Sequence, residues 1–293
     1  MGKTAFIFPG QGAQVCGMGQ DFYENSETAK AVFDRATKLL GFSVPELCFE
    51  YTQAAMVTTS VAMMKVMEER GIHADVAAGL SLGEYCALVA AGVMTADDAI
   101  RTVRERGILM QEAVPAGVGG MSAVLGMTAD EINAVVDEIP NVQVANYNCP
   151  GQIVISGLKE AVETAAVKLK EAGARRVIPL NVSGPFHSYR LEEAGEKLGR
   201  FLENIPVSEP KIPYVANVTA AYVTKAEDVK PLLTRQVSSS VRWQQSVETM
   251  LADGVDRFIE IGPGKTLAGF IRKINREATV INIEKFEDLE KLN

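Results

Sequence analysis

Residues 77–92, AAGLSLGEYCALVAAG, decide the fold. Two alanines lead into the pattern GLSLG, centred on Ser81, and a longer run of mostly small apolar residues follows. The short run before Ser81 predicts a buried strand, and the run after it predicts a helix. A GxSxG pattern between a strand and a helix is typical of a nucleophile elbow, in which the serine occupies a strained turn. The alternative is an ordinary packing turn where the strand ends.

A nucleophile elbow would place oxyanion donors beside the Ser81 hydroxyl. Gly79 and Gly83 would let the strand and the helix approach closely. The start of the helix would present unpaired N–H groups and its positive end, so we expect the N–H of Leu82 to be one donor. The glycine-rich turn FIFPGQGAQ follows the first expected strand, and the N–H of Gln11 there is the expected second donor.

A serine nucleophile needs a base, and the chain contains two histidines. His73 follows a predicted helix end, and we expect it to be an exposed loop residue. His187 lies in VSGPFHSY, directly after the last strand of a predicted small domain. Ligand sites tend to form at such seams between domains. We therefore predict that His187 is the base for Ser81.

Arg106 interrupts the apolar face of a helix that Thr95 is expected to cap. Positions 99, 103, 106, 110 and 113 share that face, and the other four are alanine, valine or methionine. An arginine there must reach water or meet an anion. Two alternatives stay open: an internal salt bridge to one of 37 acidic residues, or a bidentate clamp on a substrate carboxylate. Arg101 and Arg104 lie off this face and are expected to be surface charges.

The order of elements predicts two structural units. Strand and helix patterns alternate up to Pro115, which predicts an α/β fold with a mainly parallel sheet. The β-α-β-β-α-β order over residues 117–186 then predicts an inserted ferredoxin-like α+β small domain. Residues 1–116 and 187–293 are expected to form the larger core.

Composition excludes several classes of function. The chain has 293 residues, of which 47% are hydrophobic and 23% charged, as in globular proteins. A net charge of −8 argues against a nucleic-acid partner. Four scattered cysteines without a CxxC pair argue against a disulfide framework and against a zinc site, so no metal is expected. No apolar stretch is long enough for a bilayer, and the N-terminus lacks a signal-peptide layout, so we predict a cytoplasmic protein without a membrane partner.

Six segments together resemble the malonyl-CoA:acyl carrier protein transacylase family of fatty acid synthesis. They occur in the family's order and span nearly the whole chain. They are FPGQGAQ, GLSLGEY, RERGILMQ, ANYNCPGQIVISG, GPFHS and QVSSSVRW. The resemblance implies an α/β-hydrolase-like core with a ferredoxin-like insert. It also implies that malonyl-CoA and acyl carrier protein are the substrates and that no cofactor is used.

The resemblance also implies residue roles. Ser81 would receive the malonyl group as an ester and pass it to the phosphopantetheine thiol of acyl carrier protein, with His187 acting as base and then as acid. Arg106 would pair with the malonyl carboxylate. The backbone carbonyl of Gln236 would orient the histidine, the role that an aspartate has in a Ser-His-Asp triad.

Two further residues come from the resemblance. Asn146 would line the site. Phe186, next to the histidine, matches the pattern of malonyl-selecting acyltransferase domains, whereas methylmalonyl-selecting domains carry a smaller residue there.

The sequence departs from the family pattern at three places. Leu80 stands where most relatives have histidine, and Ser240 replaces a common proline. Glu50 runs directly into Tyr51, where relatives usually have a longer polar connection. None of these positions has an expected chemical role.

Two other classes of function stay open at this stage. A serine thioesterase or esterase would share Ser81 and His187 but would have no use for Arg106. A catalytically silent acyl-binding scaffold would keep the fold without needing the serine and the histidine together.

An acidic carrier protein would need local positive charge on a chain of net charge −8. Two groups of basic residues are candidates, although for any single residue an ordinary solvated helix face is the favoured interpretation. They are Lys168, Lys170, Arg175 and Arg176 in the small domain, and Arg272, Lys273 and Arg276 near the C-terminus.

Overall fold

A six-stranded sheet forms the core of the computed structural model, which describes residues 2–43, 51–182 and 184–292. Its strand order is β10-β9-β1-β2-β7-β8, and every neighbouring pair is parallel except the edge pair β7 and β8. The mainly parallel α/β sheet is therefore confirmed. The strands are β1 (Lys3–Phe8), β2 (Val76–Gly79), β7 (Tyr214–Val215), β8 (Tyr222–Val223), β9 (Val255–Ile261) and β10 (Thr279–Ile283).

Two hydrophobic clusters lie on the two faces of this sheet, because successive side chains of a strand point to opposite faces. In β1, Phe6 and Phe8 belong to one cluster, and Ala5 and Ile7 to the other. The first cluster includes residues of α1 (Gln20–Asn25), α2 (Glu27–Leu40), α3 (Thr52–Glu69), α4 (Gly83–Ala90), α5 (Ala96–Glu112), α8 (Glu192–Leu202), α9 (Ala226–Gln236) and the short helices η1 (Tyr189–Leu191) and η2 (Phe286–Leu292). The second includes residues of α10 (Trp243–Ala252) and α11 (Thr266–Ile274).

Capping residues fix where the helices around the site begin. The Thr95 hydroxyl accepts a hydrogen bond from the N–H of Asp98 at the start of α5. Ser26 caps α2 in the same way, and Gly41 ends that helix in the left-handed conformation that glycine adopts without strain. The predicted cap at Thr95 is confirmed, and it sets the helical register that carries Arg106.

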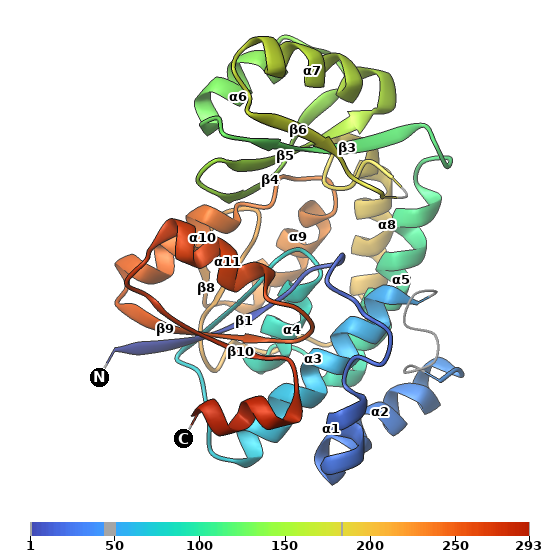
Figure 1. The fold of residues 1–293 in the computed structure, drawn as a ribbon. Helices are drawn as coiled ribbons and strands as arrows, with labels where there is room; N and C mark the ends of the chain where they lie inside the picture. The colour runs from blue at the N-terminus through green and yellow to red at the C-terminus, as the bar shows by residue number, and fades with distance from the viewer. Residues whose placement is uncertain (1, 44–50, 183, 293) are drawn as a thin grey trace.

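A second, four-stranded antiparallel sheet forms the small domain at the top of Figure 1. Its strand order β4-β5-β3-β6, with α6 and α7 packed on one face, confirms the ferredoxin-like arrangement. All its elements fall within the expected segment 117–186, whose boundaries stay a prediction. The elements are β3 (Gly119–Leu125), α6 (Ala129–Val136), β4 (Val142–Cys149), β5 (Gln152–Leu158), α7 (Lys159–Glu171) and β6 (Arg176–Pro179).

The connection between α9 and α10 fastens the core to strand β4 of the small domain. The Val241 N–H donates to the Ala145 carbonyl at 2.8 Å, and the Tyr147 N–H donates to the Val241 carbonyl at 2.9 Å. The Ser240 hydroxyl donates to the Val144 carbonyl at 2.5 Å, a hydrogen bond that the proline common in relatives could not make. These contacts hold the end of α9, where Gln236 lies, against the seam between the domains.

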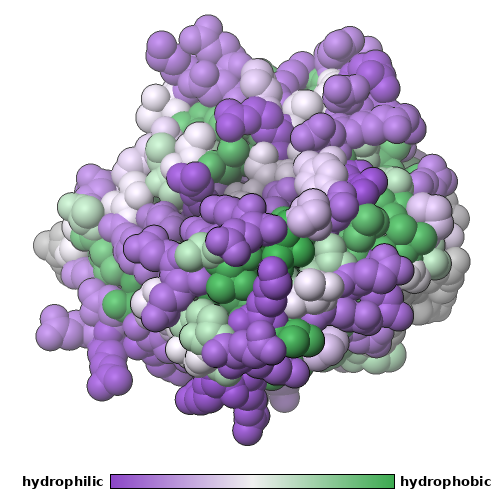
Figure 2. Space-filling model, turned by 90° about the horizontal axis from the view of Figure 1, so that it is seen from above, coloured by the Kyte–Doolittle hydropathy of each residue, from purple (hydrophilic) through white to green (hydrophobic). Residues whose placement is uncertain are grey.

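The surface on the small-domain side is largely hydrophilic, with hydrophobic patches scattered over it (Figure 2). The outer helices contribute to this, since α6 and α7 bury only one side and expose charged residues on the other. Over residues 2–43, 51–182 and 184–292, no helix has both the length and the apolar character needed to cross a membrane.

Candidate active site

Ser81 occupies a sharp turn between β2 and α4. Its φ is +52°, a left-handed conformation that side-chain-bearing residues rarely adopt. A Cβ added to Gly79 would lie 2.0 Å from the Gly83 carbonyl, and one added to Gly83 would lie 2.1 Å from the Phe8 carbonyl oxygen. Both positions therefore require glycine, and the turn has the geometry of the predicted elbow.

Asn217, which sequence analysis missed, holds this turn in place. Its side-chain oxygen accepts from the Ser81 N–H at 2.6 Å, and its side-chain nitrogen donates to the Gly79 carbonyl at 2.7 Å. Asn217 follows β7, the parallel neighbour of β2, so the two strands end at the same edge of the sheet. No local pattern marks this asparagine, because its role depends on pairing between strands far apart in the sequence.

His187 lies beside the Ser81 hydroxyl. Its Nε2 is 2.6 Å from Ser81 Oγ, and its Nδ1 is 2.9 Å from the Gln236 carbonyl oxygen. Since a carbonyl can only accept, Nδ1 carries the proton in the neutral ring, and Nε2 is free to accept from the serine. Burial and, to a smaller extent, the Arg106 charge together lower the pKa of His187 to about 4, against the opposing effect of the Gln236 carbonyl. The ring is therefore neutral at neutral pH.

Arg106 is buried, with 1% of its surface exposed, beside the serine. One terminal nitrogen donates to Ser81 Oγ at 3.0 Å and to the Gln236 side-chain oxygen at 3.1 Å, and the other donates to Gln53 Oε1 at 2.8 Å. Among the residues that the structure describes, no carboxylate lies within salt-bridge distance of this guanidinium. The internal salt bridge considered from sequence is absent from that part of the chain.

Glu84 and Gln53 are further buried polar residues that sequence analysis missed. Glu84 Oε2 accepts from the Gln236 side chain at 2.7 Å and from the Asn217 N–H at 3.3 Å, and burial raises the pKa of Glu84 to about 7. A signal was available for Glu84: it is the one charged residue in the apolar run GEYCALVAAG, as Arg106 is on its helix face.

Gln11 and Leu82 carry the two N–H groups expected to stabilise an oxyanion. Neither backbone N–H donates a hydrogen bond to any residue within the described ranges. Leu82 directly follows Ser81 at the start of α4, and Gln11 lies in the loop after β1, whose Gly10 contacts the Leu80 carbonyl closely. Both loops end at the same edge of the large sheet, which brings the two groups toward the serine.

A cavity of about 520 Å³ opens in front of these residues, between the core and the small domain. Its lining includes Ser81, Arg106 and His187 and, from the other predicted site residues, Gln11, Asn146 and Phe186. Gln236 lies behind the lining, fully buried. All eight predicted site residues are thus within or next to one site, while their individual roles stay predictions.

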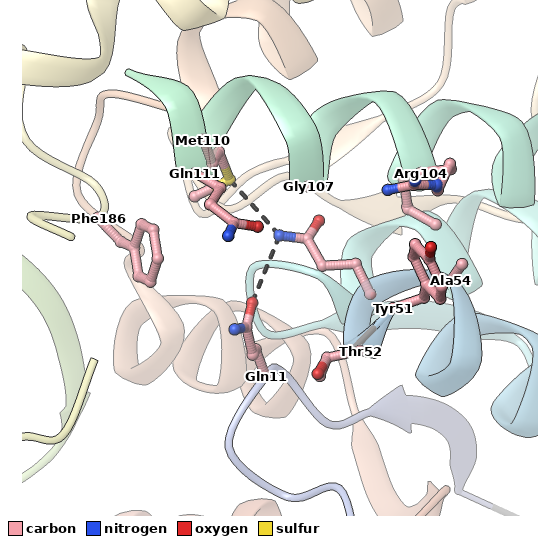
Figure 3. A pocket seen from close by; sticks show the side chains of 11 residues that line it. Gln11, Tyr51, Thr52, Ala54, Arg104, Gly107, Met110, Gln111 and Phe186 are labelled. Carbon is pink, nitrogen blue, oxygen red and sulfur yellow. Dashed lines mark hydrogen bonds between the residues drawn. The ribbon is translucent and has the colours of Figure 1, made fainter. Parts of the chain in front are cut away.

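A second cavity of about 350 Å³ adjoins the first and shares Gln11 and Phe186 with it. Figure 3 shows Phe186 at one end and Arg104 with Tyr51 at the other, with Gln11 reaching in from the loop after β1. The Arg104 guanidinium lies 4.4 Å from the centre of the Tyr51 ring. The expectation that Arg104 is an ordinary surface charge is therefore wrong, because the aromatic ring and the cavity hold it partly buried.

The remaining residues discussed from sequence lie away from the reacting groups. His73 and Arg101 are exposed, as expected. Leu80 lines the larger cavity and packs against the hydrophobic cluster around α10 and α11. Glu50, on one side of the short connection, lies outside the described residues. All seven basic candidates for carrier-protein docking are exposed.

Known proteins match this chain over nearly its whole length. Residues 5–286 match the family described as acyl transferase domain. A malonyl CoA-acyl carrier protein transacylase of Bacillus subtilis is 46% identical over 99% of this chain and 96% of its own length. The crystal structure of such a transacylase from Clostridium perfringens has a TM-score of 0.96 at 42% identity, covering 99% of this chain and 96% of that one. A malonyl-transacylase solved in complex with a type II PKS acyl-carrier protein has a TM-score of 0.95 at 38% identity, covering 99% and 98%.

Proposed function

The chain belongs to the acyl transferase family and, within it, to the malonyl CoA-acyl carrier protein transacylases, and from this premise we propose that it transfers malonyl from malonyl-CoA to acyl carrier protein through an ester on Ser81. His187 is the base and then the acid, and Arg106 binds the free malonyl carboxylate. The family membership supports the overall reaction, and the geometry around Ser81 supports the assignment of each residue.

In the first half-reaction, Ser81 Oγ attacks the thioester carbonyl of malonyl-CoA. His187 Nε2, 2.6 Å away, takes the hydroxyl proton as the new C–O bond forms. The negative charge passes to the carbonyl oxygen, where the N–H groups of Gln11 and Leu82 stabilise it. The C–S bond then breaks, and the imidazolium returns its proton to the sulfur of CoA.

The second half-reaction repeats these steps with a different nucleophile. The phosphopantetheine thiol of acyl carrier protein gives its proton to His187 and attacks the seryl ester. The C–O bond to Ser81 breaks, and His187 protonates the departing serine oxygen. Among the residues that the structure describes, no aspartate contacts the histidine. The Gln236 carbonyl holds the ring at 2.9 Å, so the imidazolium has no anionic partner there and returns its proton readily.

One observation carries this proposal: the charge of Arg106 is buried beside the nucleophile and has no carboxylate partner among the described residues. Burying an unpaired charge costs free energy, so a fold that keeps one is stabilised most when an anion binds beside that charge. A malonyl group on Ser81 presents a carboxylate two carbons from the ester carbonyl, within the same cavity. An esterase acting on uncharged acyl groups would have no use for this charge.

Intact-protein mass spectrometry after incubation with malonyl-CoA tests the proposal. We expect a malonyl adduct on the wild-type chain, its loss when acyl carrier protein is added, and no adduct on Ser81→Ala. A transient adduct that water removes at the same rate with or without carrier protein would indicate a thioesterase. No adduct at all would indicate a silent acyl-binding protein.

The proposal includes no cofactor, because protein groups and the two substrates supply every atom and proton that moves. Dialysis against EDTA should leave the transfer rate unchanged. A cytoplasmic location is also part of the proposal, and cell fractionation tests it. Carrier-protein docking on Arg175 and Arg176 is tested by reversing both charges: an unchanged carrier-protein KM would remove this patch from consideration.

A further inference from the structure

Glu84 is a buried carboxylate that the proposed mechanism does not use. It lies in the first turn of α4, three residues after Ser81, and only 1% of its surface is exposed. A buried carboxylate is costly unless hydrogen bonds satisfy it. The hydrogen-bond partners of Glu84 therefore indicate its role.

A single oxygen of Glu84 joins the two residues that hold the nucleophile and the base. Oε2 accepts from the backbone N–H of Asn217, whose side chain binds the Ser81 N–H and the Gly79 carbonyl. The same oxygen accepts from the side chain of Gln236, whose backbone carbonyl binds His187 Nδ1. Asn217 comes from the loop after β7 and Gln236 from the end of α9, so the carboxylate connects these two segments.

The Gln236 side chain has its orientation set by this contact. Its nitrogen donates to Glu84 Oε2 at 2.7 Å and to the Ser81 carbonyl at 2.9 Å, which turns its oxygen toward Arg106 at 3.1 Å. If the Gln236 amide were flipped, its oxygen would face two acceptors, Glu84 Oε2 and the Ser81 carbonyl, and its nitrogen would face the Arg106 donor. The Glu84 contact is the shortest of the three, and it thereby also sets the position of the arginine that touches Ser81 Oγ.

We propose that Glu84 is a positioning residue, whose carboxylate oxygen, acting as a hydrogen-bond acceptor, keeps Ser81 and His187 aligned through Asn217 and Gln236. This inference rests on the proposed function, since it concerns the same site. The acceptor oxygen is the required feature, and the negative charge is not. The position at which Oε2 accepts both hydrogen bonds can be filled equally well by an amide oxygen.

Two substitutions separate the acceptor from the charge. Glu84→Gln keeps the size and one acceptor oxygen but removes the charge. Glu84→Met keeps a similar length but removes both, leaving the Asn217 N–H without an acceptor and Gln236 with one contact fewer. A misalignment of reacting groups by about 1 Å can reduce a rate about 100-fold. We expect E84Q to react within about threefold of wild type and E84M to react about 10- to 100-fold more slowly.

Glu260 provides a matched control for burying methionine in place of a glutamate. It is also fully buried, but its carboxylate accepts from the N–H groups of Leu267 and Ala268 and from Asn282, none of which contacts the serine or the histidine. Glu260→Met should lower the melting temperature while the folded protein reacts at the wild-type rate.

The experiment measures the rate at which a fluorophosphonate labels Ser81, in parallel with malonyl-CoA acylation, on wild type, E84Q, E84M and E260M. The fluorophosphonate carries no carboxylate, so its reaction reports only the alignment of Ser81 and His187. Slow labelling of E84M alone is the expected result. Equal slowing of E84Q and E84M, or no slowing in either, would overturn the proposal.

Two complications are covered by the same design. Should E84M fail to fold, Glu84→Asp is measured instead, because its shorter side chain withdraws the acceptor and must also slow labelling. Failure of the proposed function has a different signature: wild type would react with fluorophosphonate but take no malonyl group, and the order of the labelling rates would still test Glu84.

Discussion

Glu84 and Glu260 are two fully buried carboxylates whose surroundings differ in one respect. The partners of Glu260 are two backbone N–H groups at the start of α11 and the amide of Asn282, all neutral. The partners of Glu84 lead through Gln236 to Arg106, which lines the cavity. In both cases burial raises the pKa of the carboxyl group. Burial alone therefore does not identify a functional group.

The two clusters differ in the charges and hydrogen-bonding groups that they leave unpaired. The Glu260 cluster satisfies its charge internally; its member Leu267 lines the larger cavity, whereas Glu260, Ala268 and Asn282 line neither cavity. The cluster around Ser81, an open cluster, includes a buried cation that no carboxylate in the described ranges contacts directly and two backbone N–H groups without acceptors there. A closed cluster, whose charge is satisfied internally, stabilises the fold. An open cluster can also bind an anion and stabilise the negative charge that develops in a reaction.

The largest expected effect comes from removing Ser81, the proposed nucleophile of the open cluster. Ser81→Ala should reduce malonyl transfer by roughly 10⁴-fold or more, because no other group can form the ester. Its folding should be little affected, since the hydroxyl contributes no backbone contact. A steady-state transfer assay with acyl carrier protein checks this. A residual rate above about one hundredth of wild type would show that the ester forms elsewhere.

The pH dependence of acylation tests the electrostatics of the open cluster. Because burial lowers the pKa of His187 to about 4, the base stays neutral well below neutral pH. The acylation rate should stay constant down to about pH 5 and then fall, measured by rapid quench with malonyl-CoA. A fall centred at the ordinary histidine value of 6.5 would contradict the burial argument.

The same pKa shift contributes to stability. The folded state disfavours the protonated ring, so the unfolded state binds more protons between pH 6.5 and about 4. The free energy of unfolding should therefore fall by about 3 kcal/mol over this range on account of His187. Denaturant unfolding of wild type and His187→Gln at both pH values isolates this contribution, because the variant lacks it.

A substitution in the closed cluster around Glu260 should lower the stability of the protein and leave its reaction rate unchanged. Glu260→Met leaves three buried donors without their acceptor, which should lower the free energy of unfolding by about 2–3 kcal/mol. Denaturant unfolding measures this loss, and the transfer rate per folded molecule should not change. A large loss of rate at unchanged stability would remove the distinction between the two clusters.

The smallest effect is expected at the seam between the two domains. Ser240→Ala removes the hydrogen bond to the Val144 carbonyl, which should cost about 1 kcal/mol of stability. Two backbone hydrogen bonds through Val241 remain, so the seam and Gln236 should keep their positions. Thermal unfolding measures the loss. A transfer rate lowered more than about tenfold would show that Ser240 acts on the site itself.

Much of the fold was predictable because its signals are local. The strand, turn and helix around Ser81, the Thr95 cap and the β-α-β-β-α-β order each occupy a continuous stretch. The two-residue strands β7 and β8 were missed, since two residues show no periodicity, and the pairing of β7 with β2 is set by tertiary contacts.

The site divides in the same way. Ser81 lies in a motif, His187 is one of two histidines, and Arg106 breaks an apolar stripe, so each stands out in the sequence. Asn217 and Gln53 do not, because an isolated amide acquires its role only from what the fold places beside it. Glu84 could have been found by the reasoning applied to Arg106, since a lone charge in an apolar helix needs an explanation.

Discrimination between malonyl-CoA and acetyl-CoA tests the central claim, that the buried charge of Arg106 binds the carboxylate of the malonyl group. The measurement is the ratio of kcat/KM for the two substrates in wild type, Arg106→Ala and Arg101→Ala, the last an exposed arginine on the same helix. An unpaired buried charge costs about 2–5 kcal/mol, so R106A should lower the ratio about 30- to 4,000-fold, and R101A should leave it unchanged. Equal losses of both activities in R106A would contradict the account.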